Sequence, residues 1–351
     1  MTMRSALYYP HTEIRSGKLM KTALMLWDRI HVIVPFDGYV PNYQSKEAKR
    51  SFELIGNCHC PTEDEKKHTH ELVEDFATRG LPESFSYFSV QSPEEIYEVY
   101  PQKLLPKTWT VLEQAGLAGK PLANADYPMA NAAGLSLMSL LADCCAGDTL
   151  VRVTDRSAAY ASLAGLMTES SPSPLNAMDT RESLLAETLK IADADSIPLS
   201  KWIKFREREV GAADGHQVRA LRHRFVEHLE AYAGRIVGAK TGAARKEMEL
   251  QFREDSRDDL RALREALKLE AGQVLSTKEI WFSALAGIAA IGSLAFSSVM
   301  PMPDVVTSTG GVASIGGLLA SRYKYVSARR KVLRDHPLSY LYEAGGGLFR
   351  L

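Results

Sequence analysis

Cysteine is scarce in this sequence. The four cysteines among 351 residues form two neighbouring pairs, Cys58 with Cys60 and Cys144 with Cys145. Neither pair has the two-residue gap of a C-x-x-C motif, so the spacing does not suit an ordinary zinc knuckle. The segment from Met1 to Ser5 carries no apolar signal-peptide core, so we expect a cytoplasmic protein with reduced thiols.

An excess of charge of either sign is also missing. Lys and Arg total 42 while Asp and Glu total 43, which gives a formal net charge of −1. This balance removes the global electrostatic argument for nucleic acid as the main partner. With 45% hydrophobic and 24% charged residues, the composition excludes wholesale disorder and a polytopic membrane protein.

The common motifs of catalysis and phosphate binding are absent as well. The sequence contains no G-x-G-x-x-G, G-x-x-x-x-G-K-[ST], G-x-S-x-G or H-E-x-x-H pattern. We therefore expect no particular cofactor, and the sequence assigns no catalytic residue.

The N-terminal part of the sequence predicts a strand, a helix and a second strand. An apolar run at 6–10 ends in proline, a helix with apolar spacing of three and four follows from Gly17 to Trp27, and a β-branched run covers 30–35. This spacing predicts a βαβ unit with a parallel strand pair. A third strand is expected at 149–153, after an apolar helix at 129–145.

The remaining segments define two parts of the chain. Short helices are expected at 46–55, 63–78, 93–99 and 107–114, and a Ser- and Pro-rich linker at 168–178. We expect an α/β domain with a small parallel sheet at 1–195 and an all-α helical-hairpin region at 196–351. Apolar residues from Val218 to Ile236 and from Leu260 to Val274 follow near-heptad spacing, so helices within 214–275 are candidates for self-association or binding of a protein partner.

A long apolar segment occupies 280–320. Its first arm, Ile280 to Met300, has 21 residues without a charge, which is long enough to cross a bilayer. Aromatic and glycine positions characterise the two arms: Trp281, Phe282, Gly287, Gly292, Phe296, Gly310, Gly311, Gly316 and Gly317. Insertion into the inner membrane and burial as a core hairpin both remain open, because the second arm is short and contains polar residues.

Polar residues near the expected strand ends are the candidates for ligand binding. In parallel sheets ligands bind at the carboxyl ends of the strands. The candidate residues are Tyr9, His11, Glu13, Asp28 and Asp155. The alternative is that Tyr and His pack at a strand end and that the aspartates cap helices.

No metal site is expected from the His- and Cys-containing segment. Cys58, His59 and Cys60 are followed by His68 and His70, but their spacing suits neither a zinc knuckle nor one helix face. Cys144 and Cys145 lie in an apolar helix, where we expect inert core residues.

Three short patterns together carry a resemblance to a known family. They are Leu7–His11 leading to Trp27–Ile30, Leu140–Ala142 leading to Val153–Asp155, and Ile203–Arg206 leading to Arg224–Phe225. The chain resembles an uncharacterised bacterial family, domain of unknown function 6236. The resemblance implies a bacterial source and transfers no catalytic residue.

The leading functional hypothesis is a bacterial effector or sensor, acting in phage defence through its apolar hairpin at the inner membrane. A soluble enzyme acting on nucleotides or nucleic acid is the first alternative. A structural subunit that oligomerises through its helices is the second. Carboxylates that converge at one site would favour the enzyme, whereas an exposed apolar hairpin would favour the effector.

Overall fold

The computed structural model describes residues 4–78, 81–147, 149–156, 159, 184–185, 188, 197–276 and 336–344. The chain divides into two compact units, which are described separately. The first unit contains Met1–Ser183 and Ile197–His216, and the second contains Leu184–Ser196 and Gln217–Leu351.

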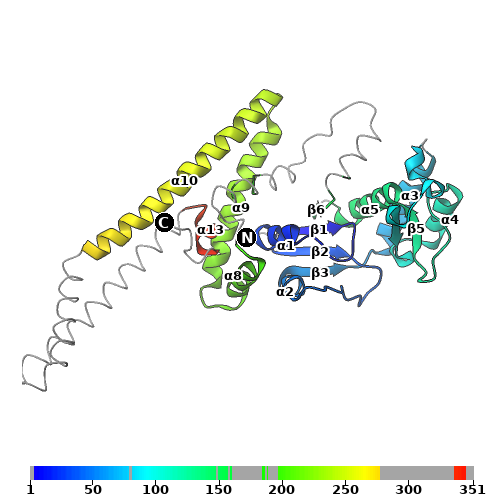
Figure 1. Cartoon of the computed structure of the whole chain (residues 1–351), viewed down its shortest axis with the longest axis horizontal. Helices are drawn as coiled ribbons and strands as arrows, with labels where there is room; N and C mark the ends of the chain where they lie inside the picture. The colour runs from blue at the N-terminus through cyan, green and yellow to red at the C-terminus, as the bar shows by residue number, and fades with distance from the viewer. Residues whose placement is uncertain are drawn as a thin grey trace, which may run out of the picture. The chain divides into compact units, whose positions relative to one another are not determined.

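A four-stranded parallel sheet is the centre of the first unit. Its strands are β1 (Ser5–Tyr9), β2 (Arg29–Ile33), β3 (Gly56–His59) and β6 (Val151–Thr154), in the order β3-β2-β1-β6. All three pairings are parallel, and the arrowheads of β1, β2 and β3 lie at the same end in Figure 1. The small parallel sheet predicted from the sequence is therefore confirmed, as is the parallel pairing of β1 with β2.

Helix α1 (Gly17–Leu26) makes the crossover between β1 and β2. The side chain of Ser16 accepts a hydrogen bond from the backbone N–H of Leu19 and so caps the helix. Leu19, Met20, Ala23 and Leu24 are buried, as their spacing predicts. The crossover sets Ala6 opposite Ile30 and Tyr8 opposite Val32 in the sheet.

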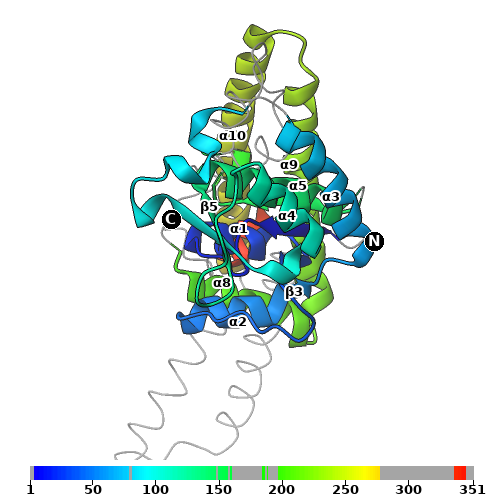
Figure 2. The same cartoon turned by 90° about the vertical axis from the view of Figure 1, so that its right-hand side faces the viewer.

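Helices cover both faces of the sheet. Helix α1 packs with α2 (Lys46–Ile55) and α8 (Leu199–Gly211), whereas α3 (Glu63–Thr78) and α5 (Asn131–Ala146) pack with each other. Figure 2 shows α2 next to α8 and α3 next to α5. The chain winds from β1 to β3 in one direction and returns to place β6 on the other side of β1. The point where the winding direction reverses therefore lies between β1 and β6.

Helix α8 belongs to the first unit, although the sequence placed the helical region from residue 196 onward. The side chains of Trp202, Phe205 and Arg206 are buried. The Arg206 guanidinium donates to the Trp27 carbonyl oxygen at 2.9 Å and to Glu209 at 2.6 Å. The charged composition of α8 concealed this buried face, and residues 197–216 group with the first unit, after which the second unit resumes at Gln217.

A smaller antiparallel sheet extends the first unit. It pairs β4 (Ile96–Val99) with β5 (Tyr127–Ala130) and is accompanied by helix α4 (Pro106–Gln114). The helix predicted at 93–99 is wrong, because only Pro93–Glu95 forms a 3₁₀ turn before β4 begins. Further 3₁₀ turns are Glu83–Phe85, Tyr87–Ser89 and Pro101–Lys103. One apolar core joins this region to β1, α3 and α5.

The described residues of the second unit are largely helical. It contains α9 (Gly215–Gly238) from residue 217 onward, α10 (Gly242–Ser276) and the short α13 (Ser339–Ala344). The Tyr232 and Phe252 rings are 4.8 Å apart, and the Tyr232 hydroxyl donates to Asp255 at 2.5 Å. Figure 1 shows α9 and α10 running side by side as a hairpin, so the predicted all-α helical-hairpin region is confirmed within the part of it that the structure describes.

The apolar segment 280–320 lies outside the described residues. None of the helices within the described ranges combines the length and apolar character that a membrane span requires.

Candidate functional site

Three buried polar atoms gather at the carboxyl ends of β1 and β6. They are Oη of Tyr8, Nε2 of His11 and Oδ1 of Asp155, and each lacks a hydrogen-bond partner among the described residues. Tyr8 is within β1, and His11 lies two residues after the last residue of that strand. Asp155 directly follows β6. Tyr8, His11 and Asp155, together with Tyr97, are called here the switch-point cluster, because β1 and β6 flank the reversal of the sheet's winding.

Tyr8 and Asp155 are electrostatic neighbours. Tyr8 is 0% exposed, and burial raises the pKa of its hydroxyl well above the usual value, with the nearby Asp155 carboxylate as the next cause. Hydrogen bonding to Asp155 also contributes to this shift, although neither Tyr8 Oη nor Asp155 Oδ1 makes a hydrogen bond of normal geometry. The phenol therefore remains protonated and has a proton to donate, while the carboxylate oxygen can accept one.

Tyr97 of β4 holds His11 in place. The two rings stack with centroids 5.8 Å apart, and the Tyr97 hydroxyl donates to the carbonyl oxygen of Pro10 at 2.9 Å. Burial, followed by the positive charges of Arg15, Arg156 and Lys103, lowers the pKa of His11 to about 3. His11 is therefore a neutral imidazole near pH 7.

Positive charge surrounds the neutral His11. Arg15 and Arg156 are exposed, whereas Lys103 is 3% exposed and burial lowers its pKa to about 8. Within the described ranges, no carboxylate forms an ion pair with Arg15, Lys103 or Arg156. The N-terminus of α1, with no acidic residue in its first turn, follows Arg15 directly. This arrangement favours an anionic group beside His11.

The other predicted site residues lie elsewhere. Tyr9 is part of the apolar core, and Glu13 accepts a hydrogen bond from the backbone N–H of Asn42 at 2.9 Å in an exposed loop. Asp28 precedes β2 at the opposite, amino edge of the sheet, where it accepts from the backbone N–H of Arg4 at 2.8 Å. Its Oδ1 is 3.9 Å from the Arg206 guanidinium. Asp28 therefore takes part in structural contacts away from His11 and Asp155.

Sequence analysis did not find Tyr97 and Lys103. Both come from the region between the strands of the parallel sheet, at least 86 residues after His11 by numbering. The segment that contains Tyr97 was interpreted as a helix, and Lys103 lies in an ordinary-looking Pro101–Lys103 turn. The sequence could have indicated Arg15 and Arg156 as site residues, because each follows a predicted strand.

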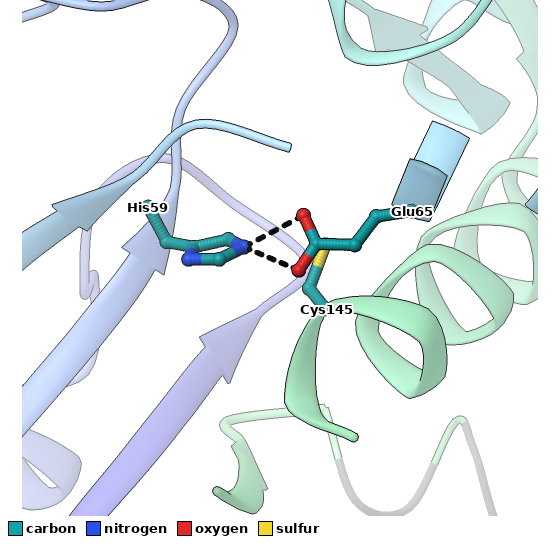
Figure 3. A group of neighbouring side chains, drawn as sticks. All are labelled: His59, Glu65 and Cys145. Atoms are coloured by element: carbon teal, nitrogen blue, oxygen red, sulfur yellow. Dashed lines mark hydrogen bonds and ion pairs between the residues drawn. The ribbon is translucent and has the colours of Figure 1, made fainter. Parts of the chain in front are cut away.

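A second group of polar side chains lies beside this site. His59 ends β3, Glu65 is in the first turn of α3, and Cys145 is in the last turn of α5; Figure 3 shows their side chains converging. Their imidazole nitrogen, carboxylate oxygen and sulfur atoms lie within 4.8 Å of one another. Lys103 connects the two groups electrostatically, since it influences the pKa of His11 and that of Cys145.

The remaining members of the His- and Cys-containing segment are not in this second group. Cys58 is exposed, and His68 lies 3.5 Å from Glu71 on the surface of α3. His70 is buried and shares a hydrogen bond of 3.1 Å with Thr108. Cys145 belongs to the buried core, as expected, and its sulfur atom also lies beside His59 and Glu65.

Comparisons with models of known protein families, with curated proteins and with solved structures give no match to this chain.

Proposed function

We propose that the first unit binds a small anionic ligand that carries hydroxyl or amino groups, such as a nucleotide, at the switch-point cluster. The observation that carries the proposal is the set of three buried, unpartnered atoms of Tyr8, His11 and Asp155. Open α/β sheets bind ligands outside the carboxyl ends of their strands where the winding reverses, and these atoms lie at that position.

Hydrogen-bond energetics favour a ligand that matches these atoms. A buried polar group without a partner costs about 1 to 3 kcal/mol, and a bound ligand that satisfies it recovers this cost. Tyr8 has a proton to donate, Asp155 Oδ1 can only accept, and the neutral His11 can do either according to its tautomer. The matching ligand therefore presents both a donor, such as a ribose hydroxyl, and an acceptor.

Local charge defines the ligand further. Arg15, Arg156 and Lys103 all contribute positive potential at His11. Phosphate is the group that arginine side chains and the N-terminus of a helix bind most readily together. A ligand with a phosphate near Arg15 and Arg156 and a hydroxyl near Asp155 satisfies both requirements.

An enzyme acting on nucleotides is the second candidate. His11, with its pKa lowered to about 3, is a poor general base near pH 7, because efficient proton transfer requires a pKa near the working pH. Lys103 favours the enzyme, since its pKa of about 8 is suited to acid–base chemistry. Incubation of the purified chain with a nucleotide that binds, followed by chromatography, separates turnover from simple binding.

The test of the proposed function is a thermal-shift screen of the full chain with AMP, ATP, NAD⁺, a sugar phosphate and inorganic phosphate. At 100 times its Kd, a ligand stabilises the unit that binds it by about 2.7 kcal/mol. The variants His11→Asn and Arg156→Ala should reduce this stabilisation, whereas Arg29→Ala should not. Arg29 is an exposed arginine at the amino edge of the same sheet, which makes it a charge-matched control.

Two results would refute ligand binding at the switch-point cluster. The first is that no compound of the panel stabilises the wild-type chain at millimolar concentration. The second is that a compound stabilises wild-type, His11→Asn and Arg156→Ala proteins equally.

We also propose that ligand binding serves a bacterial effector of phage defence whose output is the segment 280–320. The support comes from the sequence, in which 21 uncharged residues follow a sensor-like soluble unit. Fractionation of cells expressing the full chain or a chain lacking 280–320 tests this output. Recovery of both chains in the soluble fraction, with equal effects on cell growth, would contradict it.

A further inference from the structure

We propose that His59, Glu65 and Cys145 bind a transition-metal ion, with zinc as the best match to their chemistry. These three residues are called here the His59 cluster. A neutral imidazole, a carboxylate and a thiolate are the three side-chain ligands that zinc accepts in proteins. The proposal is independent of ligand binding at the switch-point cluster, since its test measures metal alone.

The geometry of the His59 cluster is close to that of a metal site. His59 Nε2 lies 3.1 Å from each carboxylate oxygen of Glu65, and the three ligand atoms all lie within 4.8 Å of one another. Ligand atoms around tetrahedral zinc are about 3.3 to 3.8 Å apart, given bonds of about 2.0 to 2.3 Å. Side-chain rotations that move the ligand atoms by about 1 Å therefore suffice to admit the ion between the imidazole and the carboxylate.

Neighbouring hydrogen bonds orient the carboxylate. Thr62 and Glu65 form a reciprocal helix cap, in which the backbone N–H of Thr62 donates to Glu65 Oε2 at 2.7 Å and that of Glu65 donates to the Thr62 hydroxyl at 3.2 Å. Groups around metal ligands usually make such contacts, which fix ligand orientation. Figure 3 shows both carboxylate oxygens of Glu65 in contact with His59, and the Thr62 backbone N–H donates to Oε2 of this pair.

Cys145 distinguishes the cluster from a simple His–Glu ion pair. The helix cap and the contact with His59 account for Glu65, but they do not require a sulfur atom beside them. Cys145 is 6% exposed, and the side chains of His59 and Glu65 are 22% and 20% exposed. A group with one buried and two partly exposed ligands resembles zinc sites in which a fourth position stays open to solvent.

The surroundings contain one opposing charge. Burial and the nearby Glu65 carboxylate raise the pKa of the Cys145 thiol, Cys144 and Cys60 act in the same direction, and Lys103 opposes them. A thiolate and a carboxylate together supply two negative charges to a divalent cation, which leaves the site neutral before Lys103 is counted. Lys103 has a pKa lowered to about 8 by burial, so it can lose its charge at modest cost.

A cobalt titration of the full chain tests this site. The protein is first freed of metal with a chelator, and Co²⁺ is then added as a spectroscopic substitute for zinc. We expect one equivalent to bind with a thiolate-to-cobalt charge-transfer band. Cys145→Ser should abolish this band, whereas Cys144→Ser, a change of the adjacent residue outside the His59 cluster, should leave it intact.

Zinc affinity provides a second measurement that does not depend on sulfur spectroscopy. His59→Gln should weaken zinc binding, followed by calorimetry, by at least about 100-fold, since the loss of supporting residues alone costs about 10- to 100-fold. His68→Gln, a surface histidine of α3, is the matched control and should bind zinc as the wild type does.

The outcomes of these experiments are decisive in both directions. The site is established if a variant of the His59 cluster melts at the wild-type temperature without metal but is no longer stabilised by added zinc. His59→Gln can give this result even if Cys145→Ser proves unstable. A wild-type chain that binds no Co²⁺ or Zn²⁺ at micromolar concentration would overturn the proposal. So would a His59→Gln variant that binds zinc with unchanged affinity.

Discussion

The neutral state of His11 gives the first unit a measurable sensitivity to acid. Its pKa is about 3 in the folded protein and 6.5 as the ordinary value, so between these values the unfolded chain binds a proton that the folded chain does not. Stability is therefore fully present above pH 6.5 and falls as the pH decreases. Because the His11 ring is only partly buried, we expect a loss of about 1 kcal/mol between pH 7 and pH 5 from this residue.

Comparison with His11→Asn isolates this effect from other histidines. Urea unfolding followed by tryptophan fluorescence at pH 7 and pH 5 should show a smaller decrease in stability for His11→Asn than for the wild type. Trp27, Trp109 and Trp202 all report on the first unit. Equal decreases for both proteins would show that His11 does not titrate with the lowered pKa.

The Tyr8 hydroxyl should lower the stability of the ligand-free first unit, although it is available to bind a ligand. Tyr8→Phe removes a buried hydroxyl that has no partner among the described residues, so we expect it to stabilise the ligand-free unit by about 1 kcal/mol. Tyr97→Phe removes a hydroxyl bonded to the Pro10 carbonyl oxygen and should destabilise by about 1 kcal/mol. Urea denaturation of both variants measures this contrast, and destabilisation by Tyr8→Phe would show that its hydroxyl has a partner.

At the scale of secondary-structure elements, one buried arginine adds polar contacts to the apolar packing that holds α8 in the first unit. Arg206→Ala removes the hydrogen bonds to the Trp27 carbonyl oxygen and to Glu209, a carboxylate that is 4% exposed. Removal of one partner from such a buried pair costs about 3 to 5 kcal/mol. Arg208→Ala, in the same helix, breaks a surface ion pair with Asp214 and should cost about 0 to 1 kcal/mol. Urea unfolding distinguishes these values, and similar costs for the two variants would contradict the anchoring role.

The elements that the sequence predicted are those with strong local patterns. β1, β2 and β6 are apolar or β-branched, and α1 has a regular buried face. β3, with the sequence Gly-Asn-Cys-His, has no such pattern and becomes a strand through its parallel ladder with β2. β4 was predicted as helix, and its pairing with β5 overrides that local preference.

The site could be predicted only where it depends on the parallel sheet. His11 and Asp155 followed from the rule that ligands bind at the carboxyl ends of parallel strands. Asp28 was included because it stands next to β2, but it precedes that strand and so lies at the opposite edge. Tyr97, Lys103 and Cys145 reach their positions through tertiary packing, which no spacing in the sequence indicates.

At the scale of the whole molecule, the second unit depends on residues that follow the apolar segment. The Tyr340 ring of α13 stacks on Phe225 of α9 at 5.7 Å, and Leu338 and Leu341 are fully buried. An internal deletion of 280–320 keeps these contacts, whereas truncation after residue 275 removes them.

We therefore expect the two shortened chains to differ in stability. The internal deletion should leave the melting temperature of the first unit unchanged, because the core of that unit is formed by its own residues. Truncation at 275 should destabilise the second unit, since it uncovers Phe225. Calorimetric melting of both chains measures this difference. A first unit that melts earlier in the internal deletion would show that the segment 280–320 supports it.

The pairing of β1 with β6 determines when the site can form during synthesis. Ala6 pairs with Val151 and Tyr9 with Thr154, so the two strands that flank the site are joined by a connection of more than 140 residues. Contacts of such high sequence separation form slowly, because the chain must close a long loop first. On the ribosome, β1 and β2 can pair early, but one edge of β1 stays uncovered until Asp155 and Arg156 have emerged. The nascent chain therefore has an exposed strand edge, open to aggregation or to chaperones, until β6 docks and completes the site.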